Sequence, residues 1–262
     1  MSIDRHAGVV GRPRVTGPEA MVEAVLELGM VPFFENSIRG YSIEEMTPPQ
    51  FWFEGDELGP WDWKIACVQS GEIAYGKFLW GGKAAFATVE FYRELMNYRR
   101  SLVKYQPDEA GSRIMDYVGE NGSITIREVR GLLGVKKSAA DAAIARLENQ
   151  TRLVIGDMQR VYRGPDLHYN GWQTASFCRP EDLFGGVGFG DEIPPRAPLG
   201  RDDRKGVACW DDRKGVPAPF LVISSEAEKS HRSPAESLAF LKSHVLRLFP
   251  HATERDLAKL LG

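Results

Sequence analysis

The side chains best equipped for chemistry gather in residues 51–64, which read FWFEGDELGPWDWK. Five of these fourteen residues are Phe or Trp and four are Asp or Glu. Aromatic rings can stack on a nucleic-acid base while a nearby carboxyl group moves a proton, so one interpretation is a cleft that acts on a base. The residues of this candidate pocket are Trp52, Glu54, Trp61, Asp62, Trp63 and, farther along the chain, His168. We favour the other interpretation, a small hydrophobic cluster beside a solvated acidic turn, because carboxylates repel the phosphates that accompany a base.

His168 is the residue whose type best suits acid–base catalysis, because the pKa of imidazole lies near neutral pH. Spacing identifies no partner for it, and a lone histidine is more often structural. The three cysteines and five histidines are scattered through the chain without the spacing of a metal site or a disulfide framework. We therefore expect no metal and no other cofactor, and the catalytic residues stay unassigned.

Basic residues concentrate in the middle of a chain that is acidic overall, with a net charge of −3. Residues 1–98 carry 8 Lys or Arg and 14 Asp or Glu, a balance of −6, whereas residues 99–163 carry 12 and 8, a balance of +4. Residues 164–262 carry 13 and 14, a balance of −1. Binding to DNA phosphates requires such a basic region. The residues that we expect to contact double-stranded DNA are Lys136, Lys137, Arg146, Arg152, Arg160 and Arg163.

The cations lie in a segment whose signals are typical of a winged helix-turn-helix. Apolar residues at three- and four-residue steps predict three helices that bury their stripes against one another, and Gly134 should end the second of them. Ser138 with Asp141 resembles the cap of the third helix. The predicted helices cover residues 113–119, 125–133 and 138–149. Two β-prone runs, 152–155 and 160–163, predict a hairpin wing with Gly156-Asp157 as its turn.

The predicted third helix has an outer face rich in alanine, at positions 139, 142 and 145. Alanine offers a base edge little beyond contact with a thymine methyl group. We therefore favour non-specific or structure-specific DNA binding over sequence-specific binding. A winged helix that serves only as a scaffold for protein contacts is the remaining alternative.

The regions on either side of this segment predict a mixed fold. Residues 64–68, 73–80 and 84–89, separated by glycines, predict an antiparallel β-meander that a helix follows at 89–98. Thr16 should cap a first helix that ends at Gly29. Ser233 with Glu236, and Thr253 with Asp256, predict the starts of two helices near the C-terminus.

The expected fold class is α+β, with a winged helix-turn-helix, an N-terminal α/β part that holds the meander, and helices at the C-terminus. At 262 residues, with 43% hydrophobic and 26% charged content, the chain can bury a sizeable core. No apolar run reaches the length of a membrane span and the first residues do not form a signal peptide, so we expect a cytoplasmic protein without membrane contact. The expected regions are 1–105, 106–190, 191–232 and 233–262.

The third of these regions interrupts the pattern. The hexamer DDRKGV occurs twice, at 202–207 and at 211–216, among many Pro, Gly and charged residues. We interpret residues 191–232 as an insertion similar to a translated repeat element, with little order and no functional site.

Residues 41–100 contain SIEEMTPPQFWF, GPWDWK, YGKF and YRELMNYRR. These runs resemble the AlkZ-related family of bacterial proteins, relatives of the AlkZ and YcaQ winged-helix DNA glycosylases. The resemblance covers most of the chain except 194–232. It implies a DNA-binding protein, or alternatively a glycosylase that acts on alkylated or crosslinked bases.

The chain departs from those glycosylases in one important respect. They are larger, and they use a Gln-x-Gln or Gln-x-Asp motif inside tandem winged helices. The only match to those letters is Gln106-Pro107-Asp108, which we place in a linker and attribute to chance. Because no catalytic residue can be carried over, we expect DNA binding without catalysis.

Overall fold

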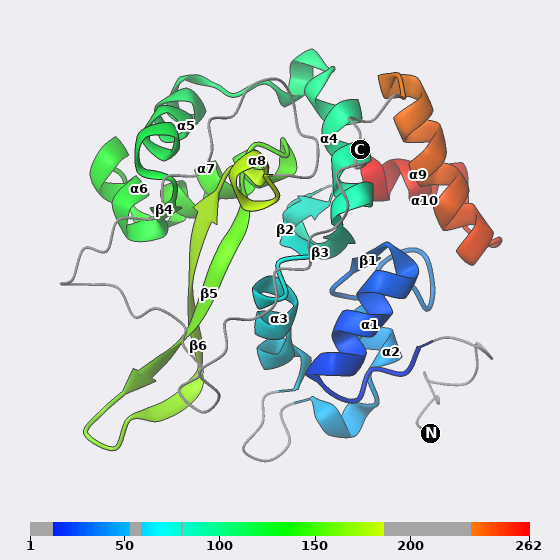
Figure 1. Ribbon diagram of the computed structural model, residues 1–262, viewed down its shortest axis with the longest axis horizontal. Coiled ribbons are helices and arrows are strands. Elements are labelled where there is room, and N and C mark those ends of the chain that lie inside the picture. The colour runs from blue at the N-terminus through cyan, green and yellow to red at the C-terminus, as the bar shows by residue number, and fades with distance from the viewer. Residues whose placement is uncertain (1–12, 53–58, 80, 186–231) are drawn as a thin grey trace.

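The computed structural model describes residues 13–52, 59–79, 81–185 and 232–262. Helices and two separate three-stranded antiparallel sheets make up these four stretches, which confirms the α+β class (Figure 1). Buried side chains from the N-terminal, middle and C-terminal parts form one continuous hydrophobic core. No helix in these four stretches is long and apolar enough to cross a bilayer.

The N-terminal part is built around the first sheet, whose strand order is β1-β3-β2. Its strands are β1 (Met30–Pro32), β2 (Ile73–Leu79) and β3 (Lys83–Thr88). The accompanying helices are α1 (Pro18–Leu28), α2 (Ile43–Met46), α3 (Pro60–Gln69) and α4 (Val89–Arg100), with short 3₁₀ turns η1 (Pro49–Phe51) and η2 (Val103–Tyr105). The helix expected at 89–98 is confirmed by α4.

The expected meander is wrong in its first strand. Residues 64–68 lie in α3, which begins at Pro60 directly after Gly59. Proline at the first helical position favours a helix start, and a short apolar run such as this one can belong to a buried helix as readily as to a strand. The third strand of the sheet is instead β1, whose three residues are all buried and too few to show a period.

One cap in this part also differs from expectation. Helix α1 begins at Pro18, which makes Gly17 its N-cap in place of Thr16. The expected end at Gly29 is confirmed, and its φ of 71° is a conformation that suits glycine.

The middle part joins three helices to the second sheet, whose strand order is β4-β6-β5. Its helices are α5 (Glu109–Asn121), α6 (Ile126–Leu133) and α7 (Lys137–Asn149), and its strands are β4 (Ile124–Thr125), β5 (Val154–Arg163) and β6 (His168–Cys178). All three expected helices are present. Helix α6 begins with a capping box between Thr125 and Glu128 and ends at Gly134 in the left-handed conformation.

The start of α7 differs from the expected Ser138 cap. Its N-cap is Lys136, and no side chain hydrogen-bonds to its first amide groups. Ser138 is the second residue of the helix, so its hydroxyl does not occupy the N-cap position.

The turn expected at Gly156-Asp157 is also wrong. Strand β5 continues through these residues with a bulge between Ile155 and Asp157, and the hairpin turns at residues 164–167. Gly156 is therefore the site of a bulge, which accommodates an isolated glycine in a strand. The second strand of the hairpin is β6, whose alternating exposed and half-buried residues pair with β5 out to Arg163 and His168.

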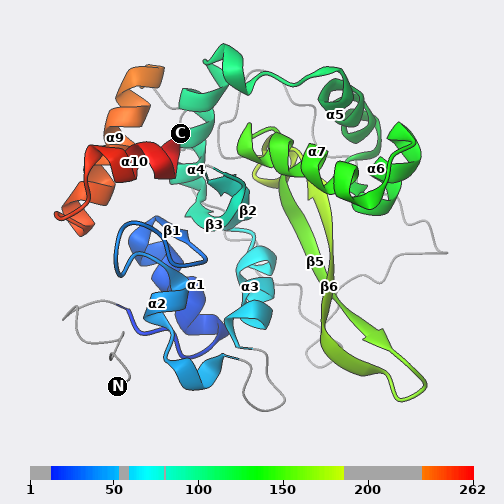
Figure 2. The same cartoon turned by 180° about the vertical axis from the view of Figure 1, so that it is seen from behind.

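After the hairpin, residues 179–185 and 232–262 contain three more helices. They are α8 (Pro180–Leu183), α9 (Pro234–Leu248) and α10 (Glu254–Leu261). The capping boxes expected at Ser233 and Thr253 are both present. Figure 2 shows α9 lying along α4. The repeated hexamers at 202–207 and 211–216, and with them all but the last residue of the expected insertion, lie outside the described residues.

Candidate nucleic-acid interface

The connection between α6 and α7 presents four exposed cations within eleven residues. Arg127 and Arg130 come from α6, and Lys136 and Lys137 come from the start of α7. The one carboxylate in this interval, Glu128, accepts hydrogen bonds from the backbone amide and the hydroxyl of Thr125, both at 2.8 Å. Residues 127–137 therefore carry four positive charges and one negative charge.

The N-terminus of α7 adds to this positive character. No side chain caps the helix, so its first amide groups are available to an acceptor from outside. Lys137 pairs with Asp141 one turn later, at 2.6 Å between Nζ and Oδ2, but its side chain is still 71% exposed. An exposed pair of this kind is weak, and a phosphate oxygen could replace the carboxylate.

Arg146, on the same helix, is paired with Asp108. Asp108 also caps α5, since its Oδ1 accepts from the amide of Gly111 at 2.8 Å. Arg146 is exposed along more than half of its side chain, so it remains at the surface despite this partner.

The side chain of Arg152 binds Gln106, in the linker that precedes α5. Its Nη2 donates to Oε1 of Gln106 at 2.9 Å, and Nε2 of Gln106 donates to the carbonyl of Arg100 at 2.9 Å. Arg152 is half-buried, and of the six cations expected at the interface it is the one most enclosed.

Arg160 lies on the hairpin and binds the N-terminal part of the chain. Its guanidinium forms a two-pronged ion pair with Asp62, in which Nε donates to Oδ1 at 3.0 Å. Tyr169 donates to the same oxygen at 2.7 Å. Gln173 donates to the carbonyl of Trp61 at 3.0 Å and to the Tyr169 hydroxyl at 3.0 Å. Trp61 Nε1 in turn donates to the carbonyl of Gly171 at 3.3 Å, so the start of α3 holds the hairpin at several points.

These contacts keep Asp62 ionised. Partial burial raises the pKa of its carboxyl group, but the hydrogen bonds from Arg160, Tyr169 and Gln173, with the charge of Arg160, outweigh that effect and hold the pKa below its usual value. A carboxylate that accepts from so many donors is suited to positioning a neighbouring strand and poorly suited to abstracting a proton.

Two residues after Asp62, Lys64 is a buried cation that sequence reasoning missed. Its side chain is 3% exposed, and Nζ lies 3.4 Å from the centre of the Trp61 ring. Burial lowers the pKa of Lys64 to about 8, although the charge of Asp62 opposes this shift. The ammonium group stabilises the position of Trp61 through a cation–π contact, and thereby the bond from Trp61 to the hairpin.

The other residues of the expected pocket lie in different surroundings. Trp63 is buried against Phe51, with ring centres 5.6 Å apart. Trp52 is half-buried and meets Phe33 edge-on, with ring centres 6.1 Å apart.

His168 is exposed on β6, and Glu54 lies outside the described residues. Of the five placed residues, Trp61 and Asp62 are the two that contact the hairpin, at residues 160–173.

Farther along the hairpin, Arg163 stacks on Trp172. The guanidinium carbon lies 5.2 Å from the ring centre, and Trp172 is 58% exposed. Arg163 therefore presents its charge at the surface beside an accessible aromatic face.

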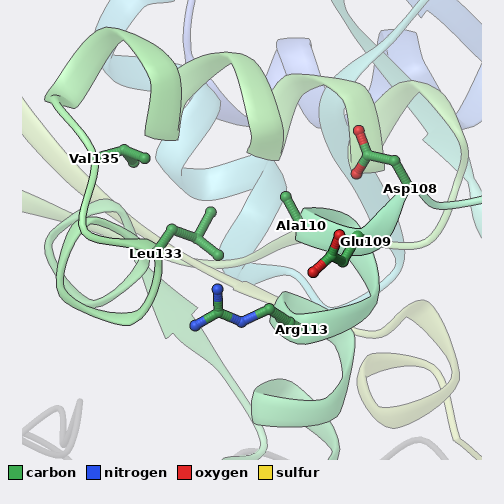
Figure 3. Close-up of a pocket in the computed structure, with 6 residues that line it drawn as sticks. All are labelled: Asp108, Glu109, Ala110, Arg113, Leu133 and Val135. Carbon is green, nitrogen blue, oxygen red and sulfur yellow. The ribbon is translucent and has the colours of Figure 1, made fainter.

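A shallow groove of about 400 Å³ adjoins the α6–α7 turn (Figure 3). Its lining residues are Asp108, Glu109, Ala110, Arg113, Leu133 and Val135. Arg113 donates to the carbonyl of Leu132 at 2.8 Å and is otherwise exposed. Charges of both signs surround three aliphatic side chains here, so the groove lacks the converging donors of a small-molecule site.

Two further observations bear on chemistry. Gln106 and Asp108, the residues that match the glycosylase letters, both use their side chains in internal hydrogen bonds. Within the four described stretches, no three His, Cys, Asp or Glu side chains gather as they would around a metal ion.

Sequence reasoning missed several residues that this geometry brings forward. Arg113, Arg127 and Arg130 are exposed cations of α5 and α6, and their positions off the apolar stripes could have identified them. The bonds of Tyr169 and Gln173 to Asp62 could not have been predicted, because Asp62 lies more than a hundred residues away from both in sequence.

The model of a family described as AlkZ related matches residues 15–195, more than half of the 262 residues. No curated protein matches, and no solved structure matches.

Proposed function

Because this chain belongs to the AlkZ-related family, we propose that it is a winged-helix protein that binds double-stranded DNA and has no catalysis of its own. The order α5, α6, α7 and then a β-hairpin, with β4 completing the sheet, is the order of a helix-turn-helix with its wing. In this assignment α7 is the recognition helix and the β5–β6 hairpin is the wing.

The observation that carries the proposal is the group of exposed cations at the α6–α7 turn. Arg127 and Arg130 of α6 and Lys136 and Lys137 at the uncapped start of α7 are all exposed, and phosphates favour both lysine or arginine side chains and helix N-termini. Arg146 extends the same charge along α7 once a phosphate competes with Asp108.

The proposed binding is largely independent of sequence. Ala139 and Ala142 are exposed on α7 and carry no hydrogen-bonding groups, so most contacts fall on the DNA backbone. Affinity should therefore fall steeply as salt concentration rises.

The absence of catalysis is proposed because the candidate groups already have structural roles. Asp62 holds the hairpin, and Gln106 and Asp108 hold the linker and the start of α5. Base excision would require a carboxylate or amide free to position water beside an extruded nucleotide.

Fluorescence anisotropy with a labelled duplex tests the binding. The double variant Lys136→Glu, Lys137→Glu should bind at least about tenfold more weakly than the wild type. The matched control is Arg255→Glu, Lys259→Glu, which makes the same change in net charge at two exposed positions of α10 and should leave affinity nearly unchanged. Equal affinity for the wild type and the Lys136, Lys137 variant would contradict the proposal.

Incubation with alkylated or crosslinked duplexes tests the second part. The expected result is that no abasic sites form. Abasic sites that form with the wild-type protein, at a rate proportional to its concentration, would identify a glycosylase instead.

A further inference from the structure

We propose that the outer face of the β5–β6 hairpin binds an unpaired nucleotide, with Trp172 stacking on the base and Arg163 binding its phosphate. This inference rests on the proposed DNA binding and names the class of DNA: a duplex that continues into a single strand.

The strand register divides the hairpin side chains between two faces. Residues that pair directly across an antiparallel ladder share a face, and successive residues alternate. Arg160 pairs with Gln173, and Tyr162 pairs with Tyr169, so these four lie on one face, which we call the inner face. Arg163 pairs with His168, and Trp172 alternates with Gln173. The register shifts between Arg160 and Tyr162, and the 5.2 Å contact of the Arg163 guanidinium with the Trp172 ring places both on the same, outer face.

The inner face is already occupied by the protein itself. Arg160 and Tyr169 bind Asp62, and Gln173 binds the carbonyl of Trp61. Figures 1 and 2 show the hairpin extending past α3 and beyond the rest of the fold. Among the residues that the structure describes, the outer face is therefore the side of the hairpin that these contacts leave for a partner.

The chemistry of the outer face suits a nucleotide. Trp172 presents more than half of its surface to solvent, and a base can stack on such a ring whatever its identity. Arg163 lies over the same ring, an arrangement that leaves guanidinium N–H groups free to bind a phosphate in two-pronged fashion. His168 lies opposite Arg163 in the strand ladder. Strand β6 contains no Asp or Glu that would repel a phosphate.

A protein partner fits this surface less well. The exposed apolar side chains of the hairpin are dispersed, since Tyr162 is on the inner face, Leu167 is in the turn and Trp172 is on the outer face. A stable protein interface requires a contiguous apolar patch. One ring beside one arginine is a sufficient site for a single base.

The test compares a blunt duplex with the same duplex carrying a single-stranded tail of about six nucleotides, a length within the range that single-strand-binding folds cover. Anisotropy of the labelled duplex should show that the wild type binds the tailed DNA about tenfold more tightly. Trp172→Ala should remove this preference and leave the affinity for the blunt duplex unchanged, whereas Trp172→Phe should retain part of it. Leu167→Ala is the matched control, because it removes an exposed apolar side chain from the turn of the same hairpin.

The outcomes separate this inference from the proposed function. Equal affinity of the wild type for both DNAs, or a preference that survives in Trp172→Ala, would overturn the inference and leave duplex binding intact. Binding of the single strand alone that depends on Trp172, with no duplex binding, would support the inference and overturn the proposed function. Sedimentation analysis that found a dimer dissociated by Trp172→Ala would overturn the inference, because the outer face would then join two copies of the chain.

Discussion

The N-terminal part of the chain and the α5–α7 helices use charge in opposite ways. In the N-terminal part Lys64, Glu94 and Arg99 are 0–3% exposed, and they act within the fold. In α6 and at the start of α7, Arg127 and Lys136 are exposed, and we propose that they bind DNA. Net charge alone does not reveal this difference, because a buried cation and an exposed one count equally.

Loss of a charge should therefore have one of two separate consequences. Removal of a buried charge should lower the stability of the fold and leave DNA affinity per folded molecule unchanged. Removal of an exposed cation near the α6–α7 turn should lower DNA affinity and leave stability unchanged. The predictions below test this separation, beginning with the largest expected effect.

Arg99 is the buried charge with the most structural contacts. Its guanidinium donates to the carbonyls of Phe78 in β2, of Asn149 at 2.7 Å and of Leu261 at 2.7 Å, and so joins three parts of the chain. Arg99→Met leaves these buried carbonyls without a donor and should lower the free energy of unfolding by roughly 3–5 kcal/mol. Urea denaturation measures this loss.

The control for Arg99 is Arg127→Met, the same substitution at an exposed site of α6. It should change the free energy of unfolding by less than about 0.5 kcal/mol while weakening DNA binding. If both variants lost the same stability, the distinction between buried and exposed cations would not hold.

Glu148 lies where the two regions meet, because it projects from α7 to β2 and accepts from the amide of Lys77 at 3.2 Å. Burial raises the pKa of Glu148 from its usual 4.5 to about 7, despite that hydrogen bond and the charge of Lys77. Between these pH values the folded state binds more protons than the unfolded state, so stability should fall as pH rises from 4.5 to about 7.

Glu148→Gln removes this titration while conserving shape. At pH 8 the variant should be more stable than the wild type by about 3 kcal/mol, and its denaturation midpoint should vary less across the same pH range. The same pH dependence in variant and wild type would show that Glu148 is not the group responsible.

Asp62 should have a smaller and more local effect. Asp62→Asn weakens the bonds to Arg160 and Tyr169 and should lower the free energy of local opening of the hairpin by about 1–3 kcal/mol. Amide hydrogen exchange in residues 160–173 should become faster as a result. Exchange in α6 and α7 should not change. Because the folded pKa of Asp62 is lowered, its contribution is present above the usual carboxyl pKa and is lost as pH falls, opposite in direction to that of Glu148.

The control here is Asp116→Asn on the exposed surface of α5. It makes the same chemical change away from the hairpin and should leave exchange at residues 160–173 as in the wild type. Faster exchange throughout the chain in Asp62→Asn would indicate global destabilisation and contradict the local role.

Much of the fold could be predicted from sequence where the signals are local. The helix starts at Ser233 and Thr253 and the helix end at Gly134 each depend on signals within a few residues, and all three predictions are confirmed. Predictions that needed a distant partner failed. Residues 64–68 became a helix, and β5 passed through Gly156-Asp157 because β6 was present to pair with it.

The same reason limits prediction of the candidate site. Asp62 was considered as an acid and Arg160 as a DNA contact, yet they are 98 residues apart and form an ion pair. Opposite charges in a sequence do not show whether they will meet, since the meeting depends on how α3 packs against the hairpin. Lys136 and Lys137 needed no such knowledge, because their exposure follows from their place at a helix start.

The salt dependence of duplex binding tests the central claim most directly. The slope of log K against log salt concentration reports how many phosphates the protein contacts. We predict a clearly negative slope for the wild type that becomes shallower by about 2 in the Lys136→Glu, Lys137→Glu variant, one unit for each lost phosphate contact. The same slope in both proteins would contradict the assignment of the α6–α7 turn as the DNA-binding surface.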